Sequence, residues 1–119
     1  MKVIISSQGP ELSAEVDPRF GRALWFILFD TDSGTFEVLD NSEQVEAAQG
    51  AGVQAAQVVA GSGAQALLTG RCGPKAYQVL VTAGVRIYSG INGTVVSAIE
   101  AWEQGGLSPL HEPDGVPRH

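Results

Sequence analysis

A glycine-bracketed loop between an apolar run and an amphipathic segment is the feature that most constrains the fold. Residues 67–76 have the sequence LLTGRCGPKA. The leading apolar pair predicts the end of a buried strand, and Pro74 predicts the first turn of a helix, where a missing N–H has no partner to lose. Gly70 and Gly73 allow a tight turn and a close approach from outside. Strand, loop and helix in this order are typical of an open α/β sheet, in which the loop after a strand is the usual ligand site.

The rest of the chain supplies the other strands and helices of such a sheet. Short β-branched, aromatic or apolar runs predict strands over residues 2–6, 25–30, 35–40, 66–69 and 85–88. Apolar residues at three- and four-residue spacing predict helices after Gly50, after Pro74 and after the N-cap candidate Thr94. The turn at residues 31–34 contains a glycine, so the second and third strands form an antiparallel hairpin.

Right-handed crossover connections then fix the strand order. They place the fourth strand beside the first, which predicts a five-stranded mixed sheet in the order 3-2-1-4-5, with strand 2 antiparallel and helices on both faces. Residues 11–22 lack a clean periodicity and are predicted to be a loop, and residues 41–49 are ambiguous between a loop and a frayed helix. We expect one domain over residues 1–104 and a mobile tail over residues 105–119, which contains three prolines.

Composition excludes several classes of function. Seven cations against thirteen acids give a formal net charge of −6, which argues against nucleic-acid binding and membrane-surface attachment. One cysteine cannot form an intramolecular disulfide, so nothing indicates an oxidising compartment. No apolar run approaches the roughly 20 residues of a membrane span, and the N-terminus lacks the pattern of a secretory signal. We therefore expect a cytoplasmic protein.

Cations concentrate in two loops that this strand order brings together. The loops after the first and fourth strands face each other where the sheet reverses its direction of growth. They carry a cysteine and four cations that are predicted to converge: Arg19, Arg22, Arg71, Cys72 and Lys75. Helix N-termini favour anions, so the pattern indicates an anion site. The simpler interpretation stays open, in which Cys72 is a small buried apolar residue and the cations form a solvated rim.

Four blocks of sequence resemble the dinitrogenase iron–molybdenum cofactor biosynthesis family. They are VDPRFGRA at 16–23, GAGVQAAQ at 50–57, TGRCGPKAY at 69–77 and GINGTVVSAIEAW at 90–102. The family includes carriers of nitrogenase cofactor assembly and the orange proteins of sulfate-reducing bacteria, which bind a molybdenum–copper sulfide cluster. This chain is similar to the orange proteins in size and in these blocks. The resemblance implies a ribonuclease-H-like α/β/α fold.

The resemblance also implies a function and a set of binding residues. The function is non-catalytic carriage of an anionic metal–sulfide cluster in cofactor assembly, storage or delivery. A molybdenum–copper sulfide cluster is the first candidate, and iron–molybdenum or iron–sulfur clusters are the second. Cys72 is the candidate metal ligand, because a thiolate suits copper(I), iron and molybdenum and its loop position favours the thiolate. The implied cluster-binding residues are Arg19, Phe20, Gly21, Arg22, Gly50, Gly52, Gly70, Arg71, Cys72, Gly73, Pro74, Lys75, Asn92 and Gly93.

One departure from the family pattern bears on the chemistry. Nitrogenase-associated members commonly have a histidine before the Phe-Gly pair, and here that residue is Arg19. A histidine–metal bond at this position is excluded, and an electrostatic contact with an anionic cluster remains. His111 and His119 lie in the predicted tail and are expected to be solvated.

The alternatives differ in class. A nuclease needs carboxylates clustered on central strands, and the first strand, KVIIS, has none. No Ser/His/Asp set, P-loop or dinucleotide-binding motif is present, so an enzyme is not expected. The remaining competitor is a regulatory or scaffold module that binds a partner ATPase or assembly factor without metal. We expect a monomer.

Overall fold

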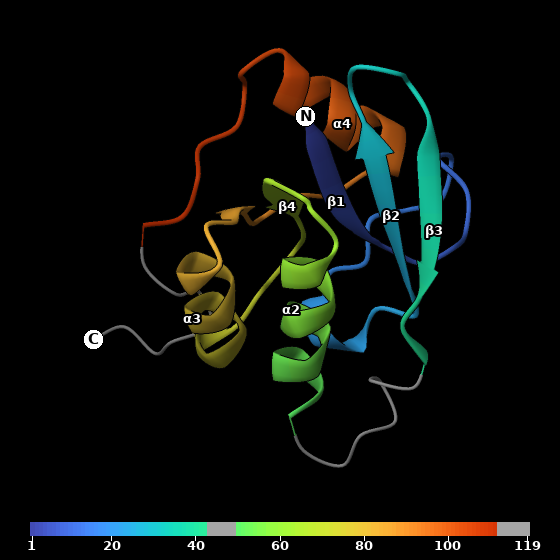
Figure 1. Ribbon diagram of the computed structural model, residues 1–119. Helices are drawn as coiled ribbons and strands as arrows, with labels where there is room; N and C mark the ends of the chain where they lie inside the picture. Colours follow the sequence, from blue (N-terminus) through green and yellow to red (C-terminus); the bar gives the residue numbers. More distant parts are fainter. Residues whose placement is uncertain (43–49, 112–119) are drawn as a thin grey trace.

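The computed structural model describes residues 1–42 and 50–111 of the chain. Its strands and helices alternate after an initial hairpin (Figure 1). The strands are β1 (Lys2–Ser7), β2 (Trp25–Asp30), β3 (Phe36–Asp40), β4 (Ala66–Leu68) and β5 (Arg86–Tyr88). The helices are the 3₁₀ turn η1 (Phe20–Arg22), α2 (Ala51–Gly61), α3 (Pro74–Thr82) and α4 (Val95–Glu103).

The sheet has the predicted order, β3-β2-β1-β4-β5. β2 pairs antiparallel with both β1 and β3, whereas β1 pairs parallel with β4 and β4 with β5. The prediction of a mixed five-stranded α/β sheet is therefore confirmed. The ribonuclease-H-like classification stays a prediction.

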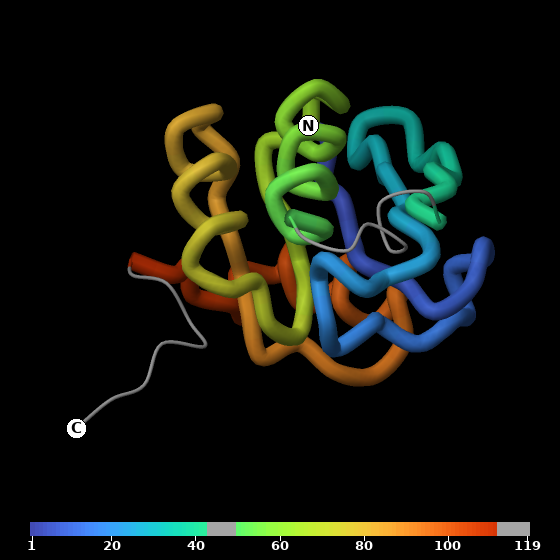
Figure 2. Tube along the Cα trace, turned by 90° about the horizontal axis from the view of Figure 1, so that it is seen from below, coloured from blue at the N-terminus to red at the C-terminus, as the bar shows by residue number. Residues whose placement is uncertain are grey.

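Helices cover both faces of the sheet, which gives three layers. Alternate residues of β1 point to opposite faces: Ile4 packs in the core beneath α2 and α3, while Val3 and Ile5 pack in the core beneath α4. Figure 2 shows α2 and α3 side by side on one face, with α4 on the other. Each core is made of aliphatic and aromatic residues and closes one face of the sheet.

The long loop after β1 is held against the end of the sheet. It was predicted to be irregular, and only its last residues form a regular turn, η1. Ser6 Oγ donates to the Asp17 carbonyl at 2.9 Å, and the Phe20 N–H donates to the Arg71 carbonyl at 3.0 Å. The first bond holds the loop against β1, and the second fastens it to the loop after β4, as expected from the strand order.

The chain leaves α4 and returns along β5. Leu107 packs against the core beneath α4, and the Leu110 N–H donates to the Ile87 carbonyl at 2.7 Å. The first part of the predicted tail, residues 105–111, thus contacts the sheet, and its mobility stays a prediction. Residues 112–119 and most of the ambiguous segment 41–49 lie outside the described residues. None of the described helices is long and apolar enough to cross a membrane.

Candidate functional site

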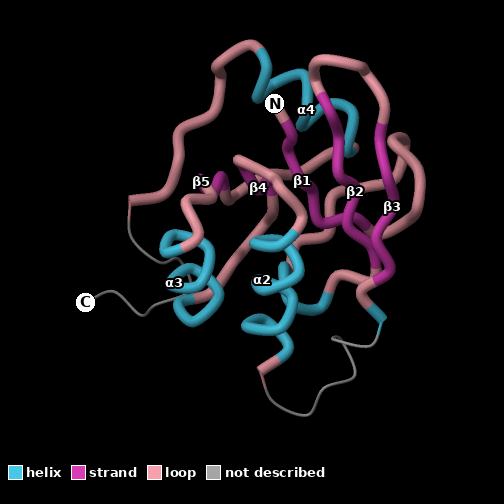
Figure 3. Tube along the Cα trace, viewed as in Figure 1, coloured by secondary structure: helices cyan, strands magenta, loops and turns pink. Residues whose placement is uncertain are grey.

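A cavity of about 410 Å³ opens where α2 and α3 begin. Both helices start at the same end of the molecule, below the sheet in Figure 1, and the loops that lead into them are visible in Figure 3. Residues from η1, α2 and the loop before α3 form its wall: Gly21, Arg22, Gly50, Ala51, Gly52, Val53, Cys72, Gly73, Pro74, Lys75 and Ala76. The cavity is therefore bounded by two helix N-termini and a 3₁₀ turn.

Neither of these helix N-termini carries a side-chain cap. Gly50 and Gly73 occupy the N-cap positions of α2 and α3, and neither helix has an acidic residue in its first turn. The first intrahelical hydrogen bonds run from Gln54 to Gly50 and from Tyr77 to Gly73. The N–H groups that precede Gln54 and Tyr77 in each helix thus have no acceptor within the helix itself. They make the cavity electrically suited to an anion.

Glycine is required at the cavity for two reasons. Gly73 has φ 87° and ψ 158°, a backbone region that essentially only glycine adopts. Gly21 and Gly52 are in direct contact, since a Cβ added at Gly21 would lie 2.8 Å from the Gly52 Cα. This contact lets η1 approach the start of α2. The glycines predicted from the sequence therefore shape the wall of the cavity.

Gly70 lets the two loops approach each other closely, at a point outside the cavity wall. A Cβ at Gly70 would lie 2.5 Å from the Cα and carbonyl oxygen of Pro18. The Thr69 hydroxyl beside it shares a hydrogen bond of 2.8 Å with the Ser6 hydroxyl, and both side chains are fully buried. The close backbone approach and the buried hydroxyl pair fix the relative position of the loops after β1 and β4.

Two cations and the sulfur atom belong to the cavity wall. Arg22 and Lys75 are exposed and line it from opposite sides, η1 and α3. Cys72 lines it from the loop before α3 and is largely buried. Arg22, Cys72 and Lys75 are thus brought together as the sequence indicated, and their role in binding stays a prediction.

Other predicted site residues lie outside this cavity. Arg19 lines a separate hollow, and Arg71 is exposed beside it. Phe20 is fully buried in the core, with its ring 5.3 Å from that of Phe26. Asn92 and Gly93 lie in the turn before α4, where the Gly93 carbonyl accepts the Val16 N–H at 2.9 Å. The turn before α4 closes the other face of the sheet and does not reach the cavity wall.

The described residues offer no ordinary metal-ion site. In residues 1–42 and 50–111, no group of three or more histidine, cysteine, aspartate or glutamate side chains lies together. Cys72 is the one soft donor on the cavity wall as described. A metal held here would have to bring most of its ligands with it, as a sulfide cluster does.

Comparison with known proteins agrees with this geometry. The family model for the dinitrogenase iron-molybdenum cofactor matches residues 1–105. The chain belongs to this family. The apo form of the orange protein from Desulfovibrio gigas is 38% identical, with a TM-score of 0.92 over 95% of each chain.

Two further relatives extend the comparison. A NifB-like protein of the DUF35 family from Thermotoga is 36% identical over 99% of this chain and 97% of its own, with a TM-score of 0.81. An uncharacterised protein of Methanocaldococcus jannaschii is 26% identical over 110 residues, which span 90% of this chain and 89% of the relative. The dinitrogenase cofactor family thus accounts for the whole fold of this chain.

Within this family fold, the sequence interpretation missed three wall residues. Ala51, Val53 and Ala76 line the cavity beside the glycines. The sequence pattern places Val53 and Ala76 on the apolar faces of helices and Ala51 in the stretch that opens one. The position of each in the first turn of its helix was the available signal, because first-turn residues lie at the open end of the element.

Proposed function

We propose that this protein carries an anionic metal–sulfide cluster in the cavity between the N-termini of α2 and α3. The observation that supports it is the convergence of two uncapped helix N-termini, Arg22 and Lys75 on one cavity. In a protein of net charge −6, this concentration of positive potential favours an anion over a neutral or cationic ligand. The cluster is cargo, and the protein supplies no catalytic group toward it.

The size and chemistry of the cavity fit such cargo. A volume of about 410 Å³ lies within the roughly 300–1,000 Å³ of small-ligand sites. Backbone N–H groups can donate to the sulfide atoms of a cluster, and the two cations can balance its charge. Cys72 adds a thiol on the same wall that could exchange with a terminal ligand of copper(I) or molybdenum.

The family resemblance supports a choice of candidates for the cluster. We take a molybdenum–copper sulfide cluster as the first candidate, and iron–molybdenum or iron–sulfur clusters as the second. The protein would hold the cluster for assembly, storage or delivery. A cytoplasmic location and a monomeric state complete the proposal.

Anaerobic reconstitution tests the proposal directly. The apo protein is mixed with tetrathiomolybdate and copper(I), or separately with an iron–sulfur donor, and is then desalted. Metal content and the visible spectrum are recorded. Retention of stoichiometric molybdenum and copper with a charge-transfer band is the expected result. Retention of iron alone would keep the carrier function and change the metal.

Three variants test whether this cavity holds the cargo. Lys75→Glu places a carboxylate on the wall and should abolish retention, whereas Arg86→Glu, an exposed cation on β5, should leave it unchanged. Cys72→Ser should shift the charge-transfer band if the sulfur bonds the metal, and should leave it in place if capture is electrostatic. A wild-type protein that retains no metal from either mixture would overturn the proposal and favour a metal-free module that binds an assembly ATPase.

A further inference from the structure

Two arginines lie next to each other outside the cavity wall. Arg19 and Arg71 are partners in a parallel β-bridge, which the hydrogen bond from the Phe20 N–H to the Arg71 carbonyl closes at 3.0 Å. Partners in such a bridge lie about 5 Å apart and on the same side of the local strands. Two positive side chains are therefore held together by the backbone itself.

Neither arginine of this pair makes an ion pair with residues 1–42 or 50–111, and both are exposed. Asp17 lies beside Arg19, and its Oδ1 accepts the backbone N–H of Arg19 at 2.9 Å rather than pairing with a guanidinium. Like charges directly opposite each other destabilise a strand pair. An external anion would relieve this repulsion.

A hollow with both polar and apolar lining residues adjoins the pair. It has a volume of about 340 Å³ and is lined by Gln8, Asp17, Pro18, Arg19 and Leu24. Leu24 is 48% exposed, which makes it one of the most exposed large apolar side chains of the described residues. Arginine is among the residues that contribute most to protein–protein binding, so the exposed pair with Leu24 beside it is a candidate contact surface.

We propose that Arg19, Arg71 and Leu24 form a docking surface for an acidic segment of a partner protein. The paired guanidinium groups would bind two carboxylates of that segment, and an apolar side chain next to them would pack on Leu24. This surface is distinct from the cavity wall, to which Arg22 and Cys72 of the same two loops belong. The proposal does not depend on what the cavity holds.

The charge distribution favours this partner over two others. In a symmetric pair, a second copy of the chain would set the same arginines against this surface, and like charges repel. A nucleic acid needs an extended basic face, and only two arginines are present here. A short acidic segment with an apolar residue matches the two arginines and the exposed Leu24.

The test uses the full-length apo protein and two labelled peptides. One is an octaglutamate, and the other has leucine in place of one central glutamate. Fluorescence anisotropy at low and physiological salt gives the affinities. The Arg19→Ala/Arg71→Ala double variant should bind both peptides about five- to tenfold more weakly. Arg86→Ala, which removes an exposed cation from β5, is the matched control and should bind as the wild type does.

A second variant and a mapping experiment separate the two components. Leu24→Ser should weaken only the leucine peptide, by about threefold. When peptide is added to the wild-type protein, the amide chemical shifts should change around Arg19 and Arg71 and not at Gly52. This experiment does not depend on the folding of any variant.

The proposal has definite contrary outcomes. Equal weakening by Arg86→Ala would show nonspecific attraction. Failure of the wild type to bind either peptide at low salt would also overturn the proposal. So would tighter binding of a single-stranded DNA of equal length, or shifts centred on the cavity. Loss of cluster retention in the double variant would assign the two arginines to the cargo site instead.

Discussion

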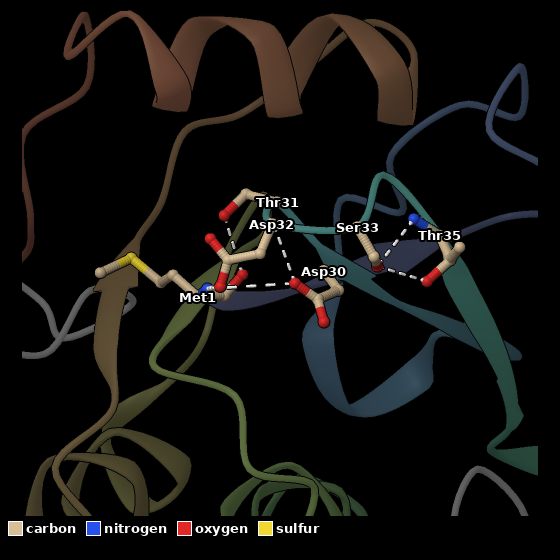
Figure 4. A network of polar contacts seen from close by, with 6 residues as sticks. All are labelled: Met1, Asp30, Thr31, Asp32, Ser33 and Thr35. Carbon is tan, nitrogen blue, oxygen red and sulfur yellow. Dashed lines mark hydrogen bonds and ion pairs between the residues drawn. The ribbon is translucent and has the colours of Figure 1, made fainter.

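The two ends of the sheet differ in whether their charged groups have partners among the described residues. At the end where β1 begins, the Met1 ammonium lies 2.8 Å from an Asp32 carboxylate oxygen and 4.0 Å from Asp30 (Figure 4). Asp30 also accepts the Asp32 N–H at 2.9 Å, and Thr31 donates its hydroxyl to the Met1 carbonyl. Met1 and the hairpin turn thus satisfy one another's charged and polar groups.

At the other end, Arg19, Arg71 and Lys75 have no ion pair within residues 1–42 and 50–111, and the starts of α2 and α3 lack side-chain caps. Departures from local satisfaction of polar groups are expected at functional sites. We expect substitutions at the cavity end to change binding more than stability, unless they disturb the glycine contacts.

Reversal of both charges on the cavity wall should produce the largest effect. In Arg22→Glu/Lys75→Glu, affinity for the metal–sulfide cluster should fall at least about 100-fold, because bonds to charged groups contribute roughly 1.5–3 kcal/mol each. Metal content after desalting and competition with a chelator measure the loss. The melting temperature should stay close to that of the wild type. Unchanged affinity would locate the cargo elsewhere and remove the functional contrast between the two ends.

Gly70→Ala should produce the largest loss of stability. The added Cβ would meet Pro18 backbone atoms at 2.5 Å, and neither backbone can withdraw while the Ser6–Thr69 hydrogen bond holds the loops. We expect the free energy of unfolding to fall by about 2–4 kcal/mol in urea titrations. Gly61→Ala is the matched control, because Gly61 lies in α2 with open space around it. It should stabilise the protein by about 0.4–1 kcal/mol.

The sequence was sufficient for the sheet and only partly sufficient for the site. The hairpin turn, the strand runs and the handedness rule gave the strand order, since each depends on local pattern and connection geometry. Helix spacing located α2, α3 and α4 to within a few residues. These features are encoded along the chain and need no knowledge of which side chains face one another.

The division of the cations between cavity and outer surface could not be predicted in this way. Arg19 and Arg22 are three residues apart in an aperiodic loop, and only the 3₁₀ turn between them sends Arg22 to the cavity. The contact between Gly21 and Gly52 depends on tertiary packing in the same way. Loop residues lack the period that reveals the buried face of a helix or strand.

Removal of the side-chain cap of α4 tests the contrast between helix N-termini, with a smaller expected loss of stability than Gly70→Ala. Thr94 Oγ1 accepts the Ser97 N–H at 3.2 Å, so α4 has the side-chain cap that α2 and α3 lack. Thr94→Ala should lower the free energy of unfolding by about 0.5–2 kcal/mol and leave cluster retention unchanged. Urea titration and metal analysis on the same sample measure the two effects. A loss of retention would mean that the α4 side of the sheet also contributes to the cargo site.

The smallest expected effect is the pH dependence of stability due to Asp30, at the end of the sheet where β1 begins. The backbone N–H of Asp32 lowers the pKa of Asp30, and the Ser33 N–H, the chain N-terminus and Lys2 act in the same direction. A carboxyl group whose pKa is lower in the folded state stabilises the fold above its unfolded pKa, and this contribution is lost as pH falls through the folded value. The melting temperature of the wild type should therefore fall more steeply than that of Asp30→Asn between about pH 5 and about pH 2.

Salt distinguishes the causes of that slope. The bond from the Asp32 N–H is short, at 2.9 Å, and is the largest contribution to the lowered pKa, whereas the ammonium of Met1 lies 4.0 Å away in an exposed position. Salt at about 0.5 M screens the second and barely affects the first. The difference in slope between wild type and Asp30→Asn should thus survive in salt. If it disappears, the ion pair with the chain terminus dominates, and this end of the sheet depends on the same screened electrostatics as the cavity.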